Sequence, residues 1–169
     1  VWVRKSVDGG STWTTLYNNL VYQSYGTVLA GVGYWRQDIK VSSTDADVIY
    51  IGGFFISKST DGGGSFIKQS NNMHVDVRTV ELISSDVNGS NGANDVLLNG
   101  NDGGISKTIN GGSLWTNLNG TGLAITQFYG LCSPETDVDD ISGGTQDNGF
   151  MTYKKGVYIT DWKRNAVGD

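Results

Sequence analysis

Two aspartates stand at matching places in this 169-residue chain and could act together on a substrate. Asp102 lies in the stretch GNDGG and Asp147 in TQDNG, and each follows a strand-like run and precedes a glycine-containing turn. Two carboxylates about 5–5.5 Å or about 6.5–9.5 Å apart hydrolyse glycosidic bonds with retention or inversion, respectively. Asp102 and Asp147 are therefore candidate catalytic or ligand-binding residues, and capping of their own turns is the alternative that we favour.

A second group of candidate residues could hold a metal ion. The segment from Asp86 to Asp95 reads DVNGSNGAND, and its oxygen-bearing side chains include Asp86, Asn88 and Asp95. Calcium takes about six to eight hard oxygen ligands, often from flexible loops of this kind. Only two carboxylates are present and the glycine spacing is irregular, so we favour a plain turn between strands. His74 has no second histidine or nearby cysteine, and we expect it to make a structural hydrogen bond rather than to bind metal.

Aromatic side chains form the third candidate, a surface for a carbohydrate or for another protein. Tyr34 and Trp35 lie near the end of a long segment, YNNLVYQSYGTVLAGVGYWRQ from residue 17 to 37, which is rich in tyrosine, asparagine and glutamine. Carbohydrate-binding faces and protein-contact loops both use planar rings beside amide groups. Packing of these rings inside the fold is the alternative, and the sequence favours neither reading.

One motif, present three times, predicts the elements that position these candidates. It reads SVDGGSTW at Ser6–Trp13, STDGGGSF at Ser59–Phe66 and TINGGSLW at Thr108–Trp115. The second copy begins 53 residues after the first, and the third begins 49 residues after the second. A period near 50 residues fits one four-stranded antiparallel blade of a β-propeller per copy. The sequence therefore predicts an all-β chain built from repeated blades.

Each position in the motif has a mechanical role in a tight hairpin. The aspartate or asparagine accepts hydrogen bonds from backbone N–H groups just downstream, and the hydroxyl two positions earlier steadies the turn. The glycines allow positive φ, and the closing aromatic residue should anchor the return strand in the core of the blade. None of these roles is catalytic. The residues are Ser6, Asp8, Gly10, Trp13, Ser59, Asp61, Gly63, Phe66, Thr108, Asn110, Gly112 and Trp115.

The repeat extends beyond the motif and predicts the organisation of the whole chain. The runs VIYIGG, VLLNGN and DISGGT are the expected second strands of successive blades, because they are mainly apolar and end in glycine-containing turns. A fourth hairpin, TYKKGVYITDW, keeps an aromatic residue at Trp162 but has Lys155 and Gly156 in place of the Asp-Gly-Gly turn, and we expect a shorter turn there. The predicted parts are the end of a blade at 1–20, blades at 21–70 and 71–120, and a partial blade at 121–169.

The three motifs resemble Asp-box repeats, the hairpins of sialidase-type and sortilin-type β-propellers and of xyloglucan-degrading glycoside hydrolases. The stretches GNDGGISKTINGGSLWTNLNGTGLAITQFYGL and GGTQDNGF also resemble large secreted bacterial proteins built from such repeats, known as sialidase-like or BNR-repeat proteins. The resemblance implies a β-propeller of the Asp-box type at the cell surface or outside the cell. It leaves the activity open, because this fold supports hydrolases, receptors and adhesive scaffolds alike.

Sialidase chemistry is not expected of this chain. It would need an arginine cluster for the carboxylate of the substrate and a tyrosine nucleophile with an acidic partner. The arginines are Arg4, Arg36, Arg78 and Arg164, and none of them lies in the Arg-Ile-Pro signature of that family.

Composition narrows the classes of partner. The formal net charge is −5 and the basic residues are scattered, so nucleic-acid binding is not expected. No run approaches the ~20 apolar residues that a membrane-spanning helix needs. Cys132 has no second cysteine to pair with in these residues, and we expect a buried, inert thiol, with pairing to a cysteine outside these residues as the alternative.

Together these features favour a non-catalytic extracellular repeat module that acts as a scaffold, an adhesin or a glycan-binding or protein-binding surface. A secreted glycoside hydrolase acting on a polysaccharide is the first alternative, and a self-assembling surface-layer or filament subunit is the second. An open stack of about three blades would leave sheet edges exposed. We therefore expect the partner to be the rest of a larger chain or further copies of this one, together with a glycan or a surface protein. Calcium is the only cofactor that the sequence suggests.

Overall fold

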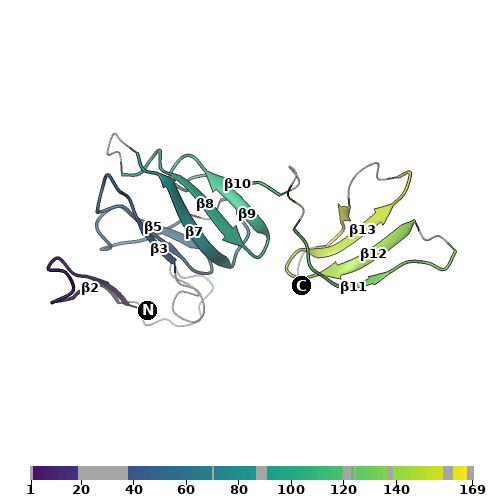
Figure 1. The fold of residues 1–169 in the computed structure, drawn as a ribbon, viewed down its shortest axis with the longest axis horizontal. Helices are drawn as coiled ribbons and strands as arrows, with labels where there is room; N and C mark the ends of the chain where they lie inside the picture. Colours follow the sequence, from purple (N-terminus) through teal and green to yellow (C-terminus); the bar gives the residue numbers. More distant parts are fainter. Residues whose placement is uncertain are drawn as a thin grey trace. The chain divides into compact units, whose positions relative to one another are not determined.

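The structure is a computed structural model that describes residues 2–18, 38–69, 71–86, 91–119, 123, 125–136, 139–157 and 162–166. All regular elements in these ranges are β-strands, and they form one two-stranded and three four-stranded antiparallel sheets (Figure 1). Within each four-stranded sheet the strands pair in the order of the sequence. The prediction of an all-β chain with four-stranded antiparallel sheets is therefore confirmed.

The strands are numbered in chain order. The first sheet contains β1 (Trp2–Lys5) and β2 (Thr14–Asn18). The second contains β3 (Asp38–Val41), β4 (Ile49–Gly52), β5 (Ile56–Ser59) and β6 (Ile67–Lys68). The third contains β7 (Val77–Ser84), β8 (Val96–Asn101), β9 (Gly104–Thr108) and β10 (Thr116–Asn117). The fourth contains β11 (Phe128–Cys132), β12 (Asp140–Thr145), β13 (Gly149–Lys154) and β14 (Lys163–Arg164).

The chain divides into two compact units, Val1–Asn119 and Gly120–Asp169, and each is described by itself. The hydrophobic core of the first unit lies where the second sheet packs against the third. Gly52 shows how close the packing is, because a Cβ at this position would lie 2.8 Å from Cγ1 of Val77 and 3.1 Å from Cγ2 of Val80. The core residues are Val48, Tyr50, Ile56, Val77, Val80, Leu97 and Trp115, with Met73 and Leu82 packed against them.

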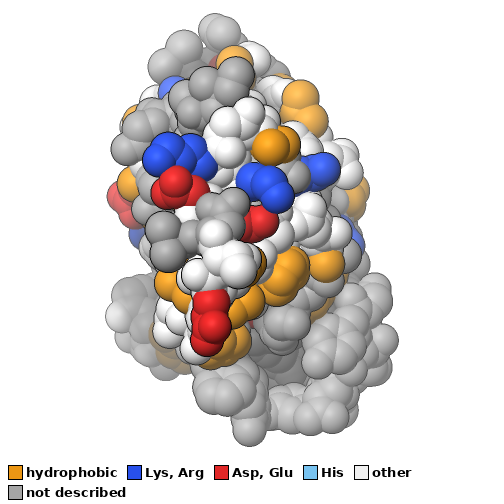
Figure 2. Space-filling model, turned by 90° about the vertical axis from the view of Figure 1, so that its right-hand side faces the viewer, with side chains coloured by type: hydrophobic (Ala, Val, Ile, Leu, Met, Phe, Trp, Pro, Cys, Tyr) orange, Lys and Arg blue, Asp and Glu red, His pale blue; other side chains and the backbone are white. Residues whose placement is uncertain are grey.

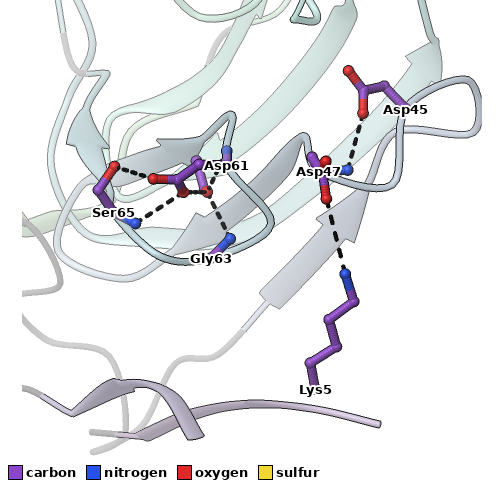
Figure 3. Close-up of polar contacts among 7 residues, drawn as sticks. Lys5, Asp45, Asp47, Asp61, Gly63 and Ser65 are labelled. Atoms are coloured by element: carbon purple, nitrogen blue, oxygen red, sulfur yellow. Dashed lines mark hydrogen bonds and ion pairs between the residues drawn. The ribbon is translucent and has the colours of Figure 1, made fainter. Parts of the chain in front are cut away.

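The second copy of the motif forms a turn held by its own side chains. The backbone N–H of Gly63 donates to Oγ of Ser59 at 2.8 Å, and the N–H of Ser65 donates to Oδ1 of Asp61 at 2.9 Å (Figure 3). The hydroxyl of Ser65 donates to Oδ2 of Asp61 at 2.6 Å. The hydrogen bonds that Asp61 accepts from the hydroxyl of Ser65, the backbone N–H of Ser65 and the hydroxyl of Ser59 lower its pKa from 3.8 to about 2.

The other two copies form the same turn. In the first copy, the N–H of Gly10 donates to Ser6 Oγ at 2.7 Å and the N–H of Thr12 donates to Asp8 Oδ1 at 2.8 Å. In the third copy the corresponding bonds run from Gly112 to Thr108 at 3.1 Å and from Leu114 to Asn110 at 3.0 Å. The six glycines have positive φ, a conformation that glycine adopts without steric cost; they are Gly9, Gly10, Gly62, Gly63, Gly111 and Gly112.

The closing aromatic residue of the motif is buried in the second and third copies and exposed in the first. Phe66 is 7% exposed and Trp115 is fully buried, as predicted. Trp13 is 59% exposed, so the prediction that it anchors a blade core is wrong. Residues that follow the second sheet lie against Trp115, whose backbone N–H donates to the carbonyl of Asn71 at 3.2 Å. In the described part of the chain no sheet precedes the first one to cover Trp13 in the same way, and its indole N–H donates to the carbonyl of Gly10 in its own turn.

A second backbone contact recurs in every four-stranded sheet. The N–H groups of Gly62, Gly111 and Lys155 donate to the carbonyls of Asp47, Asp95 and Asp139, at 3.0, 3.0 and 3.2 Å. Each bond ties a hairpin turn to the residue that leads into the second strand of the same sheet. Lys155 thus takes the place of a glycine of the motif.

The fourth hairpin differs from the others in its turn and in its length. The N–H of Val157 donates to the carbonyl of Lys154 at 3.1 Å, so Lys155 and Gly156 lie in a tight four-residue turn. Met151 pairs with Arg164, 13 positions later, whereas Ser57 pairs with Lys68 and Ser106 with Asn117, 11 positions later. The whole connection is therefore two positions longer than in the second and third sheets, and its residues 158–161 lie outside the described ranges.

Candidate functional site

The turn after β8 holds Asp102, the first candidate carboxylate. The side chain of Asn101 caps this turn, because its Oδ1 accepts a hydrogen bond from the N–H of Gly103 at 3.0 Å. Asp102 binds Arg78 of β7. The guanidinium donates through Nε to Oδ1 and through Nη2 to Oδ2, the second at 2.8 Å. Asp102 therefore takes part in an ion pair between neighbouring strands, and the favoured reading, in which it caps its own turn, stays a prediction.

The backbone of β7 aims Arg78 at this carboxylate. Val77 pairs with Asn101 and Thr79 pairs with Gly100, so Arg78 is the extra residue of a β-bulge. Bulges redirect side chains, and here the bulge lets Arg78 reach the turn after the neighbouring strand. The side chain of Asp102 is only 10% exposed, whereas that of Arg78 is 53% exposed. A two-pronged pair of this kind holds both carboxylate oxygens in fixed directions.

Asp147, the second candidate, lies in the corresponding turn between β12 and β13. Its backbone has φ of 58°, a left-handed conformation that aspartate tolerates better than most residues. The turn is closed around it, because Nδ2 of Asn148 donates to the carbonyl of Gln146 at 3.1 Å and Oγ1 of Thr145 donates to the carbonyl of Gly149 at 2.6 Å. Asp102 and Asp147 belong to different compact units, so each is described within its own unit.

The surroundings of the two aspartates differ at the bulge of the first strand. In the fourth sheet Phe128 pairs with Thr145 and Gly130 with Gly144, so Tyr129 holds in β11 the bulge position that Arg78 holds in β7. Tyr129 is 66% exposed. The fourth sheet therefore presents an aromatic ring where the third sheet presents a guanidinium.

The turn of the second sheet carries aromatic rings and no carboxylate. Phe54 and Phe55 lie edge to face with ring centroids 4.6 Å apart, and Nζ of Lys68 lies 3.4 Å from the centroid of the Phe55 ring. A cation over an aromatic face is attracted by the ring quadrupole. The three corresponding turns thus carry three different side-chain sets.

Sequence reasoning missed a row of charges on β3 and β7. Oδ2 of Asp38 accepts hydrogen bonds from the N–H of Val80 at 2.7 Å and from the hydroxyl of Thr79 at 3.1 Å. Nζ of Lys40 lies 3.2 Å from Oε2 of Glu81 and 3.6 Å from Oδ1 of Asp38. Glu81 and then Asp38 raise the pKa of Lys40. The alternation of charged and apolar residues in DIKV indicated a strand with charged side chains on one face. It did not indicate that these side chains bind Val80 and Glu81 of β7.

The candidate metal loop is part of the packing between the second and third sheets. Asp95 is fully buried, and its Oδ2 accepts a hydrogen bond from the hydroxyl of Tyr50 at 2.8 Å. Its Oδ1 accepts a bond from the N–H of Asp86 at 2.6 Å, and Oδ2 of Asp86 accepts one from Nδ2 of Asn94 at 3.1 Å. Asn88 lies outside the described residues. Both carboxylate oxygens of Asp95 and Oδ2 of Asp86 therefore accept hydrogen bonds from the protein itself.

Burial shifts the pKa values of two groups beside this loop. Burial first, and then the hydrogen bond to Asp95, raise the pKa of Tyr50. Burial lowers the pKa of Lys58, although the charges of Asp95 and Asp86 oppose that change. Nζ of Lys58 donates to the carbonyl of Gly92 at 3.0 Å, which also ties the second sheet to the loop. Within the described ranges, no three His, Cys, Asp or Glu side chains lie close enough together to hold a metal ion.

The other candidates have separate surroundings. Tyr34 and Trp35 lie outside the described residues. Nδ1 of His74 lies 3.0 Å from the carbonyl of Val75, and the ring packs against Gly103, where a Cβ would lie 2.5 Å from Cγ of the histidine. Cys132 is exposed, so the prediction of a buried thiol is wrong. It ends β11, the edge strand of the fourth sheet, which is mostly exposed.

Charges of both signs are mixed on the surface. On the face drawn in Figure 2, blue basic and red acidic side chains lie next to each other, with hydrophobic side chains exposed nearby. In the fourth sheet, Lys154 lies 3.2 Å from Asp140, and Lys155 lies 2.8 Å from Asp139. Among the residues that the structure describes, there is no helix of the length and apolar character required to cross a membrane.

Comparison with known proteins identifies the fold. No protein-family model and no curated protein matches this sequence. Among solved structures, the chain is similar to the GH74 enzyme of Niastella koreensis, with a TM-score of 0.51 and 16% identity over 96% of this chain and 25% of the enzyme. An ancestral GH74 enzyme matches with a TM-score of 0.46 and 16% identity over 98% of this chain and 21% of its own length.

The likeness to the Niastella koreensis enzyme concerns the fold alone. That enzyme is a β-propeller, and the four-stranded antiparallel sheets of this chain are built as blades of the same fold. The β-propeller prediction is confirmed in this form. The chain spans about a quarter of the length of the enzyme that it matches.

Proposed function

We propose that this chain is a non-catalytic module of an extracellular β-propeller protein of the Asp-box type, and that it presents a surface to a glycan or to another protein. The observation that carries the proposal is the ion pair of Asp102, whose two carboxylate oxygens both accept hydrogen bonds from Arg78. A glycosidase carboxylate must reach the scissile bond, either to attack the sugar or to give it a proton. Asp102 is paired with Arg78, and its side chain is only 10% exposed.

The fourth sheet supplies the best described surface for a ligand. Tyr129 is 66% exposed at the bulge of β11, and Phe150 is 40% exposed on β13. Gly130 and Gly144 pair beside them, and a Cβ at either glycine would have no neighbouring atom within 4 Å. Exposed rings next to an open backbone surface suit stacking against sugar rings or contact with a protein loop. Asp147 lies in the turn that ends β12 and is the polar candidate for the same surface.

A glycoside hydrolase acting on a polysaccharide is the second candidate function. Its support is the likeness of fold to a GH74 enzyme. In that case the catalytic carboxylates would be found in the same longer protein, and Asp147 would be the candidate from this chain.

The two functions differ in a paired assay on the longest natural protein that contains these residues. Binding is measured by co-sedimentation with insoluble polysaccharides, and hydrolysis is measured by release of reducing ends from soluble ones. The proposal predicts binding without hydrolysis, weakened at least tenfold by Tyr129→Ala and unchanged by Trp13→Ala, which removes an exposed ring from the first sheet. Release of reducing ends that disappears in Asp147→Asn would overturn the proposal in favour of the hydrolase.

A further inference from the structure

The third sheet contains buried polar side-chain atoms that have no hydrogen-bond partner among the described residues. Asn99 on β8 is fully buried, and among the described residues neither its Oδ1 nor its Nδ2 has a hydrogen-bond partner. Asn101 is 9% exposed, and its Nδ2 also has no partner, while its Oδ1 accepts from Gly103. Burying an amide without hydrogen bonds destabilises the folded state, because the amide loses its bonds to water and gains none in return. Two such amides on one strand therefore require a partner.

Both amides lie on the face of the third sheet that packs against the second. Asn99 pairs with Val80 on β7 and with Ser106 on β9, and Asn101 pairs with Val77. Val77 and Val80 belong to the core shared by the two sheets. Because residues opposite each other on neighbouring strands share a face, Asn99 and Asn101 project into the same inter-sheet layer.

The repeat shows that a strand at this position does not need an asparagine. Ile51 of β4 pairs with Ser57, as Asn99 of β8 pairs with Ser106, so Ile51 is the counterpart of Asn99 in the second sheet. Ile51 is 4% exposed and apolar. The amide at Asn99 is therefore a local feature of the third sheet and calls for a local ligand.

We propose that Asn99 and Asn101 bind an internal water molecule between the second and third sheets. Two residues that are two positions apart on a strand are separated by about 6.6 Å. One water molecule making two hydrogen bonds of about 2.8–3.0 Å joins polar atoms that are about 5 Å apart, so the two amide groups bind the same water when they lean towards each other along the strand. It can donate to Oδ1 of Asn99 and accept from Nδ2 of Asn101, which satisfies two of the four buried side-chain atoms that lack a partner among the described residues; the other two are Nδ2 of Asn99 and Nε1 of Trp115. Ordered buried water typically makes about three such bonds to otherwise unsatisfied polar groups.

The direct test measures magnetisation transfer from water to side-chain amides in the full, isotopically labelled chain. The proposal predicts cross-peaks of a long-lived water at the NH₂ groups of Asn99 and Asn101. Asn119 is the matched control, because its Nδ2 donates to the carbonyl of Gly103 and its Oδ1 accepts from the N–H of Ile105 at 3.2 Å. Absence of a cross-peak at Asn99, or equal cross-peaks at all three asparagines, would overturn the proposal.

The variant Asn99→Leu tests whether one water joins the two residues. Leucine has a similar volume and no polar atom, so the cross-peak at Asn101 should disappear while the amide of Gly103 stays protected from exchange. Amide resonances as widely dispersed as those of the parent chain report that the variant is folded. A cross-peak at Asn101 that survives in the folded variant contradicts the bridging water, and the measurement on the unsubstituted chain decides the proposal if the variant does not fold.

Discussion

Arg78 and Asp102 form a two-pronged ion pair across neighbouring strands of the third sheet, with Nη2 of the arginine 2.8 Å from Oδ2 of the aspartate. The arginine reaches the aspartate because it is the extra residue of a bulge in β7. The aspartate is mostly buried and the arginine is half exposed. The pair connects β7 to the turn after β8, and it engages Asp102, one of the two candidate catalytic carboxylates.

Substitution of Arg78 should show how much the ion pair contributes to the free energy of unfolding. Because Arg78 is half exposed, solvent screens the pair, and we expect Arg78→Ala to lower the free energy of unfolding by about 1–2 kcal/mol. Arg78→Lys should recover only part of that loss, since an ammonium cannot make both bonds of the guanidinium fork. Urea unfolding of the three proteins provides the comparison. A loss below about 0.5 kcal/mol in Arg78→Ala would contradict a structural role for the pair.

The closing aromatic residue should matter in one copy of the motif and not in another. Trp115 is fully buried between the second and third sheets, so Trp115→Ala should cost about 3–5 kcal/mol of stability. Trp13 is 59% exposed, and Trp13→Ala should change stability by less than about 1 kcal/mol. Thermal unfolding followed by circular dichroism can compare the two. Equal losses would mean that the burial of the two rings is the same in solution.

Acid should weaken the hairpin turns that contain aspartate. Hydrogen bonds from Ser65 and Ser59 lower the pKa of Asp61 in the folded chain to about 2. The stabilisation is therefore present above pH 3.8, and it is lost as the pH falls towards 2, because the unfolded state takes up the proton first. Asp61→Asn should flatten this part of the stability curve, since Asn110 makes the corresponding bonds without a titrating group. Urea midpoints between pH 2 and pH 6 test this.

The reciprocal variant Asn110→Asp is the control for the acid prediction. It places a carboxylate in the third turn, where the hydroxyl of Thr108 and the N–H of Leu114 can bind it. Stability should then depend more steeply on pH in the acid range than in the parent chain. Unchanged curves for both variants would contradict the assigned hydrogen bonds.

Alkali should act through Tyr50. Its pKa is raised by burial and by Asp95, so the folded chain keeps the phenol protonated at a pH where the unfolded chain loses the proton. Stability from this group is present below about pH 10 and falls as the pH rises above that value. Tyr50→Phe should lower stability by about 1–3 kcal/mol at neutral pH, because Asp95 loses a partner, and should reduce the fall at high pH. Chemical unfolding at pH 8 and pH 11 separates the two effects, and a parallel fall in both proteins would be contrary evidence.

The hairpin turns could be predicted because their causes are local. In each copy a hydroxyl, an aspartate or asparagine and two glycines lie within a few residues, and their hydrogen bonds close the turn without help from the rest of the chain. The residues that bury the closing aromatic side chain lie outside the motif. Trp13 and Trp115 have the same place in the motif and opposite burial, because burial depends on residues outside it.

The pairing of the candidate site residues depends on strand register and on packing between sheets. Arg78 meets Asp102 only because of a bulge in β7, and Tyr50 meets Asp95 only where the second sheet packs on the third. Residue types and spacing singled out Asp95 as part of a segment rich in oxygen-bearing side chains. They did not indicate that the buried hydroxyl of Tyr50 donates a hydrogen bond to it. Contacts of this kind join residues that are far apart in the sequence, and a single sequence contains no local signal for them.

The measurement that tests the central claim most directly is a paired measurement on Asp102→Asn. Its unfolding free energy and its release of reducing ends from polysaccharide are compared with those of the unsubstituted protein. If Asp102 is the partner of Arg78 and has no catalytic role, the variant loses about 1–2 kcal/mol of stability and neither protein releases reducing ends. Unchanged stability together with hydrolysis that disappears in the variant would show that Asp102 acts on substrate and would contradict the account.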